Sequence, residues 1–120
     1  MKKKKRITKN VKGFQLNRIT GHPSYVYWQK DTNARSVGFT HNEKDFAPKR
    51  KMKYNINPND TEDCYIKTQI EINKYNDYRS KSEYKFFRIH KDDLPLLNNI
   101  INKNKKSSKT AFKERRKRVQ

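Results

Sequence analysis

Glycine and cysteine are scarce in this 120-residue sequence, and it contains no long apolar run. Only three glycines occur, and neither a P-loop nor another Gly-rich phosphate-binding motif is present. The single cysteine, Cys64, excludes a disulfide framework and a zinc site built from cysteines, and it fits a reducing compartment. No segment reaches the length that a membrane-spanning helix requires.

The first residues, MKKKKR, look like the start of a signal peptide, but residues 7–12 are too polar to form the apolar part of one. We therefore expect a cytoplasmic protein without a membrane partner. A length of 120 residues indicates a single domain, and with 31% hydrophobic residues its core is thin.

Acidic residues are also scarce: the sequence has 12 Asp and Glu but 31 Lys and Arg, which gives a net charge of +19. Residues 1–12 carry seven basic residues and no acid, and residues 103–120 carry nine against one Glu, so these two segments hold +15 of the +19. We expect two disordered basic arms, 1–12 and 103–120, around one domain at 13–102. Such arms bind the phosphates of nucleic acid, or they keep a Lys- and Asn-rich chain in solution.

The segment from His22 to His41 predicts a β-hairpin with a histidine at each open end. Residues 24–29 and 35–41 alternate as strands do, and residues 30–33 are typical of a turn. The apolar residues 26 and 28 of the first strand can be buried together with 37 and 39 of the second in one register only. That register places residue 28 opposite 37, 26 opposite 39 and 24 opposite 41. The two imidazoles then share one face as diagonal neighbours, about 7–8 Å apart.

The other expected elements give an α+β fold, with a small antiparallel sheet of about four strands packed with one or two helices. Phe14 and Leu16 alternate as on a short strand, and Tyr84–His90 predicts another. A helix after Asp92 and Asp93 accommodates a proline in its first turn. The remaining predictions are a basic loop at 42–53, a turn at 55–60, the clearest strand at 64–72 and a loop at 73–83.

The histidines suggest chemistry on RNA. No His and Cys spacing predicts a metal site, no serine lies in a nucleophile elbow, and no cofactor motif occurs. Metal-free RNA cleavage needs a base and an acid near neutral pH, and His22 and His41, with the hydroxyl of Thr40, could supply these groups. The candidate nucleic-acid-binding residues are the cations Lys49, Arg50, Lys51 and Lys53, with Tyr25 and Tyr65 stacking on bases.

Each candidate also has a plainer interpretation, which the sequence leaves open. A histidine at a strand end is often a surface or capping residue, and His90 fits such a structural role. Tyr25 and Tyr27 form either a base-stacking surface or the packing face for a helix. The basic residues at 49–53 either contact phosphates or are simply solvated.

Three short strings, HPSYVYW, SVGFTHN and NINPND, the last followed by the strand CYI, carry a resemblance over residues 21–72. They resemble phage- and mobile-element-associated RNase toxins of the barnase–EndoU–colicin–RelE-like nuclease group. In that pattern a His-Pro opens a strand, a Thr-His closes the next and an Asn-Pro turn precedes a third, as at 22–23, 40–41 and 57–58 here. The sequence departs from it at Asn42, where the pattern has Ser, and at 73–83.

The resemblance implies a compact antiparallel sheet and metal-independent RNA cleavage, with His22, Thr40 and His41 at the site. It leads us to expect a toxin-like endoribonuclease that acts on RNA rather than DNA and that an acidic antitoxin or inhibitor protein could neutralise. The alternative is a non-catalytic nucleic-acid-binding protein of a mobile element, a ribosome or a regulatory complex. A membrane-surface or protein-inhibitor role is a third possibility.

Overall fold

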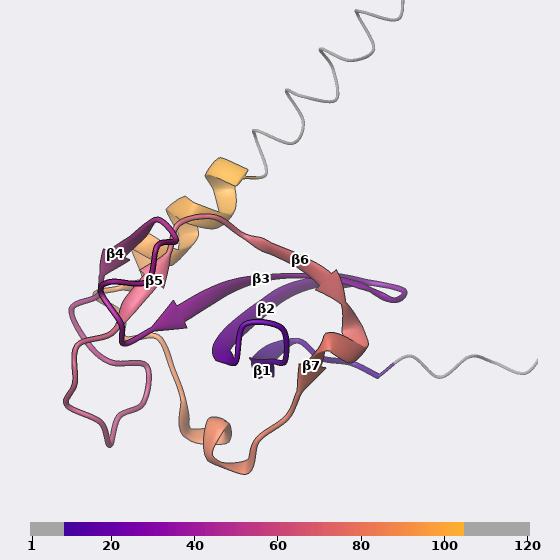
Figure 1. Ribbon diagram of the computed structural model, residues 1–120, viewed down its shortest axis with the longest axis horizontal. Helices are drawn as coiled ribbons and strands as arrows, with labels where there is room; N and C mark the ends of the chain where they lie inside the picture. The colour runs from indigo at the N-terminus through magenta and orange to yellow at the C-terminus, as the bar shows by residue number, and fades with distance from the viewer. Residues whose placement is uncertain (1–8, 105–120) are drawn as a thin grey trace, which may run out of the picture.

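The structure, a computed structural model, describes residues 9–104 and shows an α+β arrangement of one antiparallel sheet and one helix (Figure 1). The sheet has seven strands in the order β4-β5-β3-β2-β1-β7, with β6 also paired to β3. The α+β class is confirmed, but the sheet is larger than the expected four strands. The strands are β1 (Gly13–Asn17), β2 (His22–Lys30), β3 (Asn33–Thr40), β4 (Lys49–Lys51), β5 (Tyr65–Lys67), β6 (Glu71–Lys74) and β7 (Tyr78–Arg79).

The predicted hairpin is present as β2 and β3, but its register differs from the expected one. Ser24 lies opposite Gly38 and Tyr25 opposite Val37, and a bulge then shifts the pairing around residue 27. The prediction was wrong because it assumed that only one face of the hairpin is buried. Both faces of the hairpin are buried in the structure, so apolar side chains on either face pack against other apolar residues.

Two apolar clusters bury the two faces of the hairpin. The larger contains Val37 and Phe39 of β3, with Tyr25 packed against it; the smaller contains Val26 and Ala34. The smaller cluster also includes Val11, which is fully buried although it lies within the predicted arm 1–12. Residues 1–8 of that arm lie outside the described part of the chain.

The predicted strand at 64–72 is two shorter strands, β5 and β6, which pair with opposite ends of β3. The break at residues 68–70 changes which side chains face inward. Ile72 is consequently 66% exposed, and Glu71 faces the protein interior. The segment predicted as a loop, 73–83, contains the end of β6 and all of β7.

The strand predicted at 84–90 is absent from the described chain. A 3-10 helix, Ser82–Phe86, occupies its first part, and irregular backbone follows. Phe86 is 53% exposed, whereas Tyr84 and Phe87 pack inward without joining the sheet: Tyr84 stacks on Phe87, whose ring lies 5.8 Å from that of Phe14.

The predicted helix spans 94–104 and packs Leu97 and Ile100 into the larger cluster. The carbonyl of Asp93 accepts the first hydrogen bonds of this helix, from Leu96 and Leu97. Its carboxylate does not cap the helix but accepts two backbone N–H groups of the 53–54 segment, at 2.9 and 3.0 Å. The helix includes residues 103 and 104 of the predicted tail, and 105–120 lie outside the described residues. Within the described chain, no helix has the length and apolar character needed to cross a membrane.

Candidate active site

The three predicted catalytic residues line one small pocket of about 50 Å³. His22 begins β2 and Thr40 ends β3, with His41 directly after it, and these ends lie at the same edge because the strands are antiparallel. The 55–64 segment closes the other side of the pocket with polar side chains, Asn55, Asn57 and Asp60 among them. The sequence therefore identified residues that the fold brings together, although the register used to connect them was wrong.

Thr40 contributes a hydroxyl to this pocket from an almost fully buried side chain. Its Oγ1 accepts the backbone N–H of Asn42 at 3.1 Å. That contact uses a lone pair of the oxygen and leaves the O–H proton available to donate.

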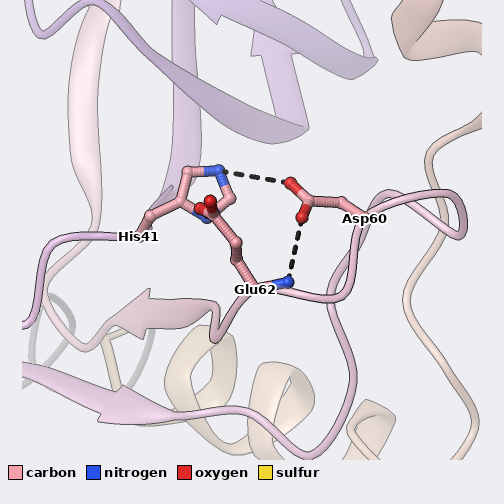
Figure 2. Close-up of side chains that lie close together, drawn as sticks. All are labelled: His41, Asp60 and Glu62. Atoms are coloured by element: carbon pink, nitrogen blue, oxygen red, sulfur yellow. Dashed lines mark hydrogen bonds and ion pairs between the residues drawn. The ribbon is translucent and has the colours of Figure 1, made fainter.

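His41 lies among oxygen atoms of the following loop (Figure 2). Its Nδ1 is 3.3 Å from the carbonyl oxygen of Asp63 and 3.8 Å from Glu62 Oε1, and its Nε2 is 3.9 Å from Asp60 Oδ2. Asp60 is itself oriented, because its other oxygen accepts the N–H of Glu62 at 2.9 Å. The ring is about half exposed, so a substrate can reach it.

His22 has a carboxylate partner of its own. Its Nε2 is 3.9 Å from Asp45 Oδ2, and the same oxygen is 3.9 Å from the ammonium of Lys67, a buried lysine. A hydrogen bond from the Ala47 N–H, together with the nearby charges of Lys67 and Lys49, lowers the pKa of Asp45 below its ordinary value. Asp45 is therefore ionised at neutral pH, and a negative charge lies beside His22.

His41, Asp60 and Glu62 also form a possible cation-binding trio, because their ligand atoms all lie within 4.8 Å of one another. The spacing of the sequence predicted no metal site, since two of these residues come from a loop that only folding brings to His41. Nitrogen and carboxylate oxygen donors suit several divalent ions. All three side chains are partly solvent-exposed.

The predicted basic residues at 49–53 have different surroundings. Lys49 donates to two backbone carbonyls of the preceding loop, Lys51 lies 3.5 Å from a carboxylate oxygen of Asp63, and Lys53 lies 3.9 Å from another aspartate. Among the described residues, Lys49 and Arg50 form no ion pair, and Arg50 is the member of this group whose side chain has neither an ion pair nor a hydrogen bond. None of the four lines the pocket of the histidines.

The two tyrosines predicted to stack on bases are both partly buried. The ring of Tyr25 packs 5.2 Å from that of Phe14, against the larger apolar cluster. Tyr65 is in β5, where it lies opposite Thr40 on one side and Lys51 on the other. The packing of Tyr25 matches the alternative interpretation of this residue.

Sequence reasoning missed a polar cluster inside the sheet. Glu71 Oε1 accepts hydrogen bonds from Ser24 Oγ at 2.7 Å, Ser36 Oγ at 2.8 Å and Asn17 Nδ2 at 3.2 Å. The three donors are fully buried, and Ser36 also shares a 2.6 Å hydrogen bond with Tyr78. Buried serines within two paired strands are the signal that could have predicted a polar partner.

No protein-family model, curated protein or solved structure matches the chain.

Proposed function

We propose that this protein is an endoribonuclease that cleaves RNA by proton transfer at the pocket of His22, Thr40 and His41, without a metal. The observation that carries the proposal is that two imidazoles and one hydroxyl face a single small pocket. Imidazoles transfer protons efficiently near neutral pH, and two of them supply the base and the acid that the reaction requires.

The proposed reaction is an internal displacement. One imidazole takes the proton of a ribose 2′-OH, the 2′ oxygen attacks the adjacent phosphorus, and the bond from phosphorus to the 5′ oxygen breaks. The other imidazole gives a proton to that leaving oxygen. The products are a 2′,3′-cyclic phosphate and a 5′-OH, and the hydroxyl of Thr40 donates to a non-bridging phosphate oxygen as charge develops there.

The dimensions of the pocket set how RNA would bind. A pocket of about 50 Å³ is too small for a nucleotide, so the phosphate group enters it while sugars and bases remain on the surface. The net charge of +19 attracts the RNA backbone over a longer range.

Cleavage of labelled RNA in excess EDTA tests the proposal. We expect His22→Ala and His41→Ala each to lower the rate by about 10²- to 10⁴-fold, the usual contribution of a general acid or base. His90→Ala is the matched control, because His90 stacks 3.9 Å from the ring of Tyr54 and does not line the pocket. It should cleave like the wild type.

Two results would contradict the proposal. Intact RNA, bound equally by the wild type and by a His22→Ala/His41→Ala double variant, would favour the alternative of a non-catalytic nucleic-acid-binding protein. Cleavage that stops in EDTA and returns with a divalent ion would contradict a metal-free reaction and implicate the trio of His41, Asp60 and Glu62.

The proposal extends to partners. RNA is the substrate rather than DNA because the nucleophile is a 2′-OH, and an acidic inhibitor protein would suit a chain with a net charge of +19. An active toxin of this kind, acting in the cytoplasm, should resist cloning in cells that lack the inhibitor. Ready expression of the active wild type without an inhibitor would argue against the toxin role.

A further inference from the structure

A second hollow lies between the β4–β5 edge of the sheet and the helix at 94–104, which are neighbours in Figure 1. Its volume is about 420 Å³, large enough for a nucleotide. Arg50 and Gln69 line the sheet side, and Leu96, Asn99 and Lys103 are among the residues on the helix side. It shares no lining residue with the pocket of the histidines.

The charges of this groove differ from those around the histidines. No acidic residue among the described residues 9–104 lines it, whereas carboxylates lie within 4 Å of both His22 and His41. Arg50 and Lys103 are both exposed, and neither forms an ion pair with another described residue. Two cations without carboxylate partners on facing walls make a site for a phosphate group.

The rest of the lining suits a nucleobase. The apolar side chains of Leu96 and Ile100 offer a surface against which the face of a base can pack. The amides of Gln69 and Asn99 supply hydrogen-bond donors and acceptors of the kind that bind base edges. The sequence after residue 104 adds eight Lys or Arg against one Glu, so the helix leads into a strongly basic part of the chain.

We propose that this groove, which we call the Arg50 groove, binds a nucleotide of single-stranded RNA outside the cleavage pocket. A phosphate lies between Arg50 and Lys103, and its base lies on Leu96 and Ile100. The inference rests on the proposed function only in its choice of RNA as the ligand. It assigns to Arg50 a role that differs from that of the neighbouring Lys49, Lys51 and Lys53.

Fluorescence anisotropy with a labelled single-stranded RNA tests the inference on the full chain. All proteins carry His22→Ala/His41→Ala, so that the RNA stays intact. Arg50→Gln/Lys103→Gln is compared with Lys30→Gln/Lys91→Gln, which removes the same charge from exposed residues outside the groove, Lys30 being at the tip of the β2–β3 hairpin. Circular dichroism melts verify that both variants fold.

We expect the groove variant to bind RNA about tenfold more weakly and the control to change less than about twofold. The slope of log Kd against log salt should fall by about 0.7 for each phosphate contact that the variant loses. Equal loss in both variants, or no loss in either, would overturn the inference. This result is independent of the cleavage assay: an RNA that the wild type leaves intact in that assay, but whose binding still requires Arg50 and Lys103, would refute the proposed nuclease and leave the groove supported.

Discussion

The polar cluster around Glu71 requires a glycine at position 38. A Cβ atom built on Gly38 would lie 2.6 Å from Glu71 Oε2 and 3.2 Å from Cδ of Lys67. The lysine methylene can move at little cost, but the carboxylate is fixed because three buried donors bind its other oxygen. Gly38→Ala should therefore displace Glu71 and break some of these hydrogen bonds.

The size of the effect follows from those bonds. A hydrogen bond to a charged group contributes about 1.5–3 kcal/mol, and a buried donor left without a partner costs about 1–3 kcal/mol. Replacing a glycine recovers about 0.4–1 kcal/mol through the unfolded chain. Because Glu71 is only partly buried, we expect Gly38→Ala to lower the free energy of unfolding by about 2–4 kcal/mol, a large fraction of the stability of a small domain.

Urea unfolding of a double-mutant cycle measures this coupling. On a Glu71→Ala background the added methyl group no longer meets a carboxylate, so Gly38→Ala should cost less than about 0.5 kcal/mol there. If Gly38→Ala destabilises both backgrounds equally, the cost comes from the strand itself and the argument about Glu71 is refuted. An unchanged stability of the single variant would refute it as well.

Three further predictions concern side chains whose surroundings the structure defines. Because the Ala47 N–H holds the pKa of Asp45 below 3.8, this carboxylate stabilises the fold above pH 3.8 and loses its effect as the pH falls through the folded pKa. Asp45→Asn should therefore lower stability in urea at pH 6, and this loss should shrink as the pH falls below 3.8; a loss that stays constant over that range would contradict this. Burial raises the pKa of Cys64, so iodoacetamide at pH 8 should alkylate it at least about tenfold more slowly in the folded than in the urea-unfolded chain, and equal rates would count against the burial. Asp93→Ala should cost about 1.5–3 kcal/mol in thermal unfolding because two loop N–H groups lose a buried acceptor, while exposed Asp92→Ala costs less than about 0.5 kcal/mol; similar values for the two would refute that distinction.

Local signals in the sequence predicted the hairpin, its turn and the helix. Asp31 has a positive φ of 56° in the two-residue connection between β2 and β3, where a turn was expected. The helix begins after the pair of aspartates, as its N-terminal residues and its apolar spacing indicated. These features depend on residues that are close in the chain.

Features that depend on the whole sheet could not be predicted in this way. The alternation at 64–72 is continuous in the sequence, but the break after Lys67 reverses it and places Glu71 next to Ser24 and Ser36. The register of β2 and β3 likewise depends on a second buried face, to which Val11 and Tyr78 contribute from distant parts of the chain.

The sequence predicted which histidines form the candidate site, but it did not predict which carboxylates lie beside them. His22, Thr40 and His41 lie at strand ends that a hairpin necessarily brings together. Asp45 and Asp60 lie near these histidines but belong to irregular loops. The spacing of apolar residues predicts strands and helices, and it does not predict the course of a loop.

The chemistry of the RNA ends distinguishes the proposed cleavage by His22 and His41 from every other reaction on RNA. An RNA with one unmodified ribose in an otherwise 2′-O-methylated strand offers a single 2′-OH for attack, and mass spectrometry of its products in excess EDTA reports where and how it is cut. We predict one cut, 3′ to that ribose, that leaves a 2′,3′-cyclic phosphate and a 5′-OH with the wild type and is lost in His41→Ala. Cleavage of the fully 2′-O-methylated strand, or products carrying a 5′-phosphate, would contradict this prediction.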